Sequence, residues 1–154
     1  MGQYWRCVNL DKKEFIDPHA LDSGAKLAEQ LGTYPGVGSA LIILCAAMPE
    51  VRGGGDLDLD ENWHGPERSG GPPGPMPDDY PAIAHSTIGR WAGDRIAFVG
   101  DYAKDSDLAP QFRASSIYQL CKDREYKDVS VDVCRVIEHE LCGKFTEDGW
   151  EDVK

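Results

Sequence analysis

The sequence predicts a single α+β domain over residues 1–154, with helices packed on one face of a mostly antiparallel sheet of about four to five strands. Two observations support this fold class. Short apolar runs bounded by turn residues alternate with segments whose apolar residues recur at helical spacing. A chain of 154 residues is also long enough to bury roughly 68% of the surface that it exposes when unfolded, and no shift of composition divides it.

The N-terminal residues predict a β-hairpin followed by a helix. Residues 4–10 and 14–16 are apolar in character, and the polar residues between them are typical of a turn. Asp17-Pro18 ends the second strand, because proline cannot donate a hydrogen bond to a ladder. In residues 20–31 leucines then recur at roughly helical spacing, with Gly32 placed after the helix end.

Residues 37–48 are apolar nearly throughout. Such a run fits a buried strand and a buried helix equally well by periodicity. Ile42 and Ile43 favour a strand, whereas the alanines favour a helix. We expect a buried strand here.

Residues 89–103, GRWAGDRIAFVGDYA, are expected to form the centre of the sheet. Residues 96–99 are an apolar run between two Gly-Asp pairs, which is the pattern of a mostly buried strand. Arg90 and Trp91 precede Gly93-Asp94, so a tight turn at that pair would fold a short strand back against the apolar one.

Three further helices and an acidic tail are predicted. Residues 81–88 begin with a proline, which suits a first helical turn. Ser115 or Ser116 can cap a helix that continues through Cys121. Residues 129–141 place apolar side chains on one helical face. We expect residues 144–154 to form a frayed acidic tail, with Trp150 folding back on the body of the domain.

A long loop is predicted over residues 49–81. This segment holds seven of the ten prolines together with seven glycines, a density that prevents regular helix or central strand. Loops longer than about 15 residues are uncommon in compact domains and are usually functional or disordered. The loop is therefore where we first expect a recognition site.

The net charge of −11, with 27 acidic against 16 basic residues, argues against a nucleic-acid partner and favours a basic one. The N-terminus shows no apolar core of a signal peptide, and no apolar run reaches the roughly 18 residues of a membrane helix. Five cysteines without a CxxC pair indicate reduced thiols. We expect a cytoplasmic protein with no membrane partner.

The loop contains an acidic pattern that could hold a divalent cation. Acids fall at positions one, three, five and twelve, as in a calcium loop, and His64 adds a nitrogen ligand; the candidate metal residues are Asp56, Asp58, Asp60, His64 and Glu67. Glu61 stands where such a loop needs glycine, and Pro66 denies it a flanking helix. The alternative is a solvated acidic segment in which Leu57 and Leu59 pack inward and the aspartates face water.

Carboxylates also stand at both ends of the apolar run 96–99. Asp94 and Asp101 each follow a glycine, and a ligand site there could bind a cationic or polar group; its candidate binding residues are Arg90, Trp91, Asp94, Asp101 and Tyr102. The alternative is turn chemistry alone, because aspartate bonds nearby amides and glycine tolerates a positive φ.

Other residue patterns exclude several chemistries. Cys134 and His139 point about 140° apart on a helix, so they cannot share one zinc ion. No nucleophile elbow and no phosphate-binding glycine motif is present. We therefore predict a non-enzymatic acidic protein that binds another protein or a small ligand through its long loop. The alternative is a metal-binding domain or metal-dependent hydrolase centred on the acidic pattern.

The opening MGQYWRCVNLDKKEF and the later GRWAGDRIAFVGDYA resemble a set of small bacterial and phage proteins that share such a start and a W-A-G-D…G-D-Y block. That set has no assigned activity, so it brings no catalytic residues to this chain. The resemblance implies a free-standing small domain carried by a phage, for which interference with a host protein would be a natural use.

Overall fold

The structure is a computed structural model that describes residues 2–59 and 79–152. Helices and strands together form one α+β domain, so the predicted fold class is confirmed. The described part contains five α-helices, three short 3-10 helices and six strands. None of these helices combines the length and the apolar character that crossing a bilayer requires.

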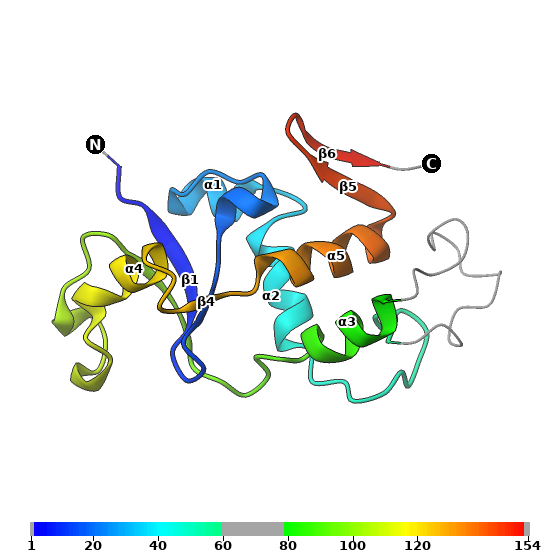
Figure 1. Ribbon diagram of the computed structural model, residues 1–154, viewed down its shortest axis with the longest axis horizontal. Coiled ribbons are helices and arrows are strands. Elements are labelled where there is room, and N and C mark those ends of the chain that lie inside the picture. Colours follow the sequence, from blue (N-terminus) through cyan, green and yellow to red (C-terminus); the bar gives the residue numbers. More distant parts are fainter. Residues whose placement is uncertain (1, 60–78, 153–154) are drawn as a thin grey trace.

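The main sheet has four strands in the order β3-β1-β2-β4 (Figure 1). They are β1 (Trp5–Asn9), β2 (Glu14–Ile16), β3 (Ile96–Gly100) and β4 (Lys127–Asp128). β1 runs antiparallel to β2 and to β3, whereas β4 runs parallel to β2. The predicted N-terminal hairpin is confirmed. Its turn is closed by Asn9 Oδ1, which accepts hydrogen bonds from the amides of Asp11 and Lys12 at 2.9 and 2.8 Å.

The prediction that residues 89–103 form the centre of the sheet is wrong. β3 is an edge strand, and the central positions belong to β1 and β2. Arg90 and Trp91 lie in turns and not in a strand. The reason is a competing set of backbone hydrogen bonds: the amides of Gly89 and Trp91 donate to the carbonyls of Ile43 and Leu44, so this segment joins the end of a helix.

A second prediction, a buried strand at residues 37–48, is also wrong. The segment forms the helix α2 (Val37–Cys45). Its buried side chains follow a helical spacing: Val37, Ala40, Ile43 and Leu44. The periodicity of the apolar run could not distinguish a strand from a helix. Tertiary packing favours the helix, because α2 lies between α1 and α5 and buries one face against the core.

The other helices follow the predictions in part. α1 (Leu27–Gly32), α3 (Tyr80–Thr87), α4 (Ala114–Lys122) and α5 (Ser130–Leu141) occupy the expected regions. Residues 20–31 do not form one helix, because the 3-10 turn η1 (Pro18–Leu21) precedes α1, and Gly32 belongs to the last turn of α1.

The expected serine cap of α4 is also wrong. Arg113 is the N-cap residue, and the capping carboxylate is Asp105, which accepts bonds from the amide and hydroxyl of Ser115 at 3.0 and 2.7 Å. Two further 3-10 turns, η2 (Asp105–Asp107) and η3 (Pro110–Phe112), bring Asp105 to that position. The cap is therefore supplied across a loop rather than by a neighbouring side chain.

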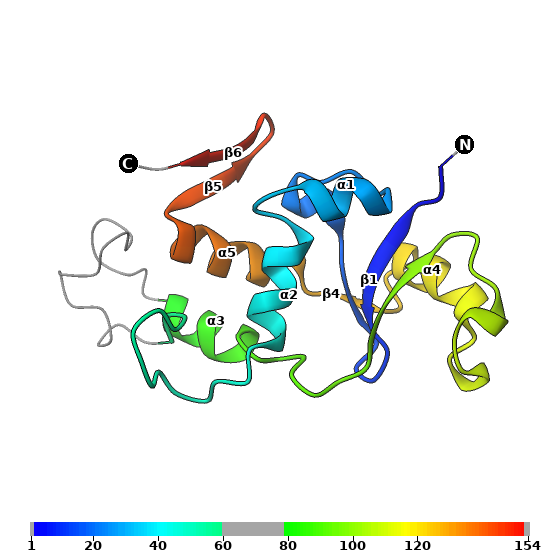
Figure 2. The ribbon, with the colours of Figure 1, turned by 180° about the vertical axis from the view of Figure 1, so that it is seen from behind.

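Helices cover both faces of the sheet rather than the one face expected. Adjacent strand residues point to opposite sides, so Cys7 and Val8 belong to different clusters. α4 packs against Val8, Phe15 and Val99 on one side. α2, α3 and α5 gather on the other side, as Figures 1 and 2 show from front and back. Trp91 is buried in the core cluster on that side.

The C-terminal residues are ordered as a hairpin, so the prediction of a frayed tail is wrong for residues 144–152. β5 (Gly143–Thr146) pairs antiparallel with β6 (Gly149–Asp152) beyond the end of α5 (Figure 1). Trp150 packs against Phe145 with ring centroids 4.9 Å apart, and both contact the main core. The expected folding back of Trp150 is confirmed, because burying two aromatic rings outweighs the acidic character of the segment.

Candidate functional site

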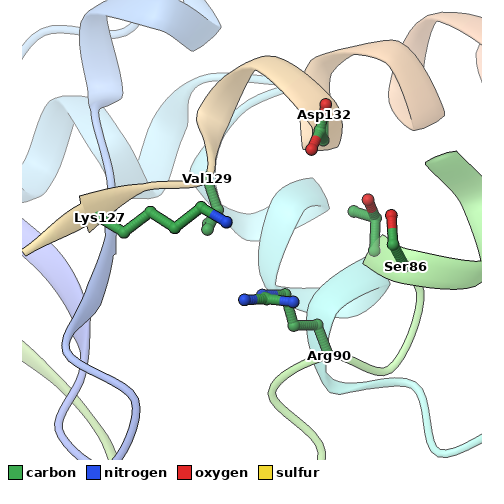
Figure 3. A pocket seen from close by; sticks show the side chains of 6 residues that line it. Ser86, Arg90, Lys127, Val129 and Asp132 are labelled. Carbon is green, nitrogen blue, oxygen red and sulfur yellow. The ribbon is translucent and has the colours of Figure 1, made fainter.

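A small polar pocket of about 90 Å³ lies where the end of α3, β4 and the start of α5 meet. Figure 3 shows its side chains converging from these elements. Five polar side chains and one apolar side chain line it: Ser86, Thr87, Arg90, Lys127, Val129 and Asp132. Of the candidate binding residues predicted from the sequence, Arg90 is the one that lines this pocket.

Arg90 is held in place by a buried carboxylate. Its Nε donates to Glu14 Oε1 at 2.9 Å, and its Nη2 donates to Glu14 Oε2. The indole nitrogen of Trp91 donates to the same Oε1 at 2.9 Å. This arrangement fixes the guanidinium at one wall of the pocket before any ligand arrives.

The charged groups of this cluster shift one another's pKa values. Burial raises the pKa of Glu14, but hydrogen bonds from Arg90 and Trp91 and the positive charges of Arg90 and Lys127 outweigh it, so the pKa stays below its ordinary value. The hydrogen bonds to Glu14 raise the pKa of Arg90 against its partial burial, and the charge of Asp132 adds to that rise. Glu14 and Arg90 therefore form a charged pair at neutral pH.

A second polar cluster ties the start of the long loop to α5. Asp58 is buried, and its Oδ2 lies 2.8 Å from His139 Nε2. The amide of Asp58 donates to Glu140 Oε1. The ring of His139 lies against that of Tyr80, with centroids 3.9 Å apart and planes tilted by 30°. The side chain of His139 thus faces the interior.

The predicted metal residues are partly described. Asp56 Oδ2 accepts the amides of Arg52 and Gly53 at 2.8 and 3.0 Å, so it closes a turn. Asp58 is buried against α5, which differs from the expectation that the aspartates face water, whereas the expected burial of Leu59 is confirmed. Asp60, His64 and Glu67 lie outside the described residues. Within residues 2–59 and 79–152, no group of three or more metal-ligating side chains comes together.

The remaining candidate binding residues do not line the pocket. Trp91 is fully buried in the core. Asp94 accepts hydrogen bonds from Asn9 and Lys12, which lowers its pKa. Asp101 accepts the amide of Tyr4 at 3.0 Å, and Tyr102 is exposed nearby in sequence. Both aspartates therefore bond to the N-terminal segment, far away in sequence, rather than to the nearby amides that the turn alternative expects.

Three pocket-building residues were missed from the sequence: Glu14, Lys127 and Asp132. Each looks like an ordinary surface charge in its own segment, and Glu14 stands far from the other two in the chain. Only the parallel pairing of β4 with β2 and the start of α5 bring them together.

Exposed apolar side chains occur on α1, α2 and the segment between them. Their exposed fractions are 44% for Leu27, 89% for Leu31, 78% for Tyr34 and 69% for Ile42. The two helices contact each other, and we call these four residues the α1–α2 apolar residues. Exposed apolar side chains that lie together on neighbouring elements often mark an interaction surface.

Comparisons of the chain with protein families, with curated proteins and with solved structures found no match.

Proposed function

We propose that this protein is a non-enzymatic binding protein whose partner is a protein with a basic surface. The observation that carries the proposal is the net charge of −11 combined with the α1–α2 apolar residues. An excess of acid attracts basic partners over distance and speeds their encounter. Apolar contact then supplies the affinity that charge alone does not give.

The α1–α2 apolar residues suit such a contact. Leu27 and Leu31 are four residues apart on α1 and share one helical face. Tyr34 brings a large ring with a polar tip, the kind of side chain that is enriched at interfaces. A partner that combines Lys or Arg with apolar side chains would meet both the charge and these residues.

The long loop remains part of the proposal. Its first residues are anchored, because Leu57 and Leu59 pack on the core and Asp58 bonds to α5. Recognition by the remainder of residues 49–81 adds a second contact to the same partner. The resemblance to phage proteins makes a host protein the natural partner, with interference as the outcome.

Selection from a random peptide library displayed on phage tests this function. Selected peptides should combine basic with apolar residues, and their binding should weaken as salt is raised. The double variant Leu31→Ser with Tyr34→Ser should bind a synthetic copy of such a peptide at least about tenfold more weakly, because two apolar contacts are lost.

The matched control is Val131→Ser, which removes an equally exposed apolar side chain from α5. This variant should bind the peptide like the wild type. Selection of peptides without basic residues, or equal binding by the double variant, would contradict the proposal.

A further inference from the structure

We propose that the pocket between α3, β4 and α5 binds a small α-amino acid by its carboxylate and ammonium groups. This site is separate from the α1–α2 apolar residues and goes beyond the function proposed above. The inference starts from how the pocket's charges are arranged.

The charges of the pocket are balanced but separated. Glu14 neutralises Arg90 through the hydrogen bonds already described. Lys127 and Asp132 remain as one exposed cation and one exposed anion, and neither forms an ion pair within the described residues. A pocket of this kind favours a ligand with one positive and one negative group over a simple anion or cation. Each charged group of such a ligand can lie near a side chain of opposite charge.

The geometry places the two signs on different walls. Figure 3 shows the ammonium of Lys127 and the guanidinium of Arg90 on one side of the pocket, with Asp132 and Ser86 across it. A ligand carboxylate directed towards Lys127 and Arg90 leaves its ammonium directed towards Asp132. The hydroxyl of Ser86 already donates to the carbonyl of Ile83 at 3.1 Å, so its oxygen is oriented as an acceptor for that ammonium.

The size of the pocket limits the ligand. A cavity of about 150 Å³ holds benzene, and this pocket has about 90 Å³. By this proportion it encloses roughly four non-hydrogen atoms, so glycine, which has five, fills the pocket and reaches its open edge. Exposed Ser86, Lys127 and Asp132 form an open rim. A short side chain of the amino acid can extend through this rim into solvent.

Arg90 makes the site rigid. Two of its nitrogens are held by Glu14, so a ligand carboxylate does not have to order this side chain on binding. Lys127 is the more mobile of the two cations because it is exposed and long. The affinity therefore depends on Lys127 and Asp132 being intact, while Arg90 serves the fold as well as the ligand.

Titration of the isotope-labelled protein by NMR tests the site, with glycine as the ligand and acetate and methylamine as its two halves. Glycine should shift the amide resonances of residues 86–90 and 127–132. Acetate and methylamine should each bind more weakly, because each satisfies one wall of the pocket. Glycine that leaves these resonances unshifted, or acetate that binds as tightly as glycine, would overturn the proposal.

Single-charge variants sharpen the test. Lys127→Gln and Asp132→Asn should each weaken glycine binding about fivefold, which is the scale of one partly exposed ion pair. Lys122→Gln and Asp148→Asn, which neutralise exposed charges on α4 and in the β5–β6 turn, should bind glycine like the wild type. Wild-type affinity in both pocket variants would refute the assignment. The double variant of Leu31 and Tyr34 should keep glycine binding, so failure of the peptide experiment and failure of this one are distinguishable.

Discussion

The carboxylate of Glu14 in β2 accepts a hydrogen bond of 2.9 Å from the indole nitrogen of Trp91, a residue 77 positions later in the chain. Both side chains are buried. The backbone amide of Trp91 donates to the carbonyl of Leu44 at 2.7 Å, so this residue also joins the sheet to α2. One carboxylate thus holds the indole in the core and the guanidinium of Arg90 at the pocket.

Replacing Glu14 should destabilise the protein strongly. Glu14→Ala leaves the indole N–H without an acceptor and Arg90 without its counter-charge. Breaking a fully buried pair costs 3–5 kcal/mol; because Arg90 is one-third exposed, we expect a loss of about 2 kcal/mol in the free energy of unfolding. Urea unfolding of Glu14→Ala, Trp91→Phe and the double variant measures this. Strict additivity in that cycle would show that the two residues are not coupled.

Stability should fall as the pH drops below about 4.5. Interactions with cationic or hydrogen-bonding groups leave five carboxyl groups with lowered pKa values in the folded state: Asp11, Glu14, Asp79, Asp94 and Asp105. The unfolded chain then binds more protons than the folded one in this range, so acid favours unfolding. The stabilisation is fully present above the ordinary pKa values and is lost as the folded values are passed. Urea unfolding across pH 3–7 should show this loss, with a shallower slope for Glu14→Gln; a constant free energy down to pH 3 would contradict it.

Gly89 should not tolerate a side chain. Its φ is +77°, and a Cβ atom there would lie 2.6 Å from the carbonyl oxygen of Ala46. Gly89→Ala should therefore lose about 2–3 kcal/mol of unfolding free energy, from backbone strain and a backbone clash together. Gly93→Ala is the matched control, because Gly93 has a φ of +82° but open space around it. It should lose only about 1 kcal/mol, and equal losses in thermal unfolding would rule out the clash.

His139 should hold the start of the long loop on α5. His139→Phe keeps a ring against Tyr80 but removes the nitrogen that meets Asp58, which leaves a buried carboxylate with one partner fewer. Hydrogen exchange at the amide of Asp58 should speed up about tenfold or more, because local opening becomes easier. His85→Gln changes an exposed histidine on α3 and should leave that exchange unchanged. Unchanged exchange in His139→Phe would mean that the loop is held by other contacts.

The thiols should differ sharply in reactivity. Cys45 is exposed, whereas Cys7 and Cys121 are buried. Burial raises the pKa values of Cys121 and Cys134 to about 12 and that of Cys7 further still, so little thiolate forms at neutral pH. Burial and the charge of Asp94 also raise the pKa of Cys45, so its reaction should quicken as the pH rises. Native-state alkylation followed by mass spectrometry should modify Cys45 first, and Cys45→Ser should remove the fast phase. A fast phase that persists in this variant would place the reactive thiol elsewhere.

Local patterns were enough for much of the secondary structure. The β1–β2 hairpin follows from apolar segments on either side of a polar turn, and α5 follows from apolar residues on one helical face. The same reasoning failed for α2, because a run that is apolar on every side has no face to reveal its period. It also placed β3 wrongly at the centre of the sheet, because central and edge strands can have the same apolar sequence pattern.

The candidate site depended far more on tertiary structure. Arg90 could be singled out from the sequence, but its partner Glu14 and the opposing charges of Lys127 and Asp132 could not. A charge on an isolated segment gives no sign of whether it faces water or another charge. That outcome depends on strand pairing and helix placement, which bring residues from β2, β4 and α5 to one point.

The sequence by itself determined the α+β class, the N-terminal hairpin and the acidic character of the protein, because these depend on neighbouring residues or on the whole composition. Tertiary structure alone decided that α2 is a helix, that the C-terminal segment forms a hairpin and that three charged side chains line one pocket. The physical reason is that burial and ion pairing are interactions between distant parts of the chain, and their free energy exists only once the fold has brought those parts together.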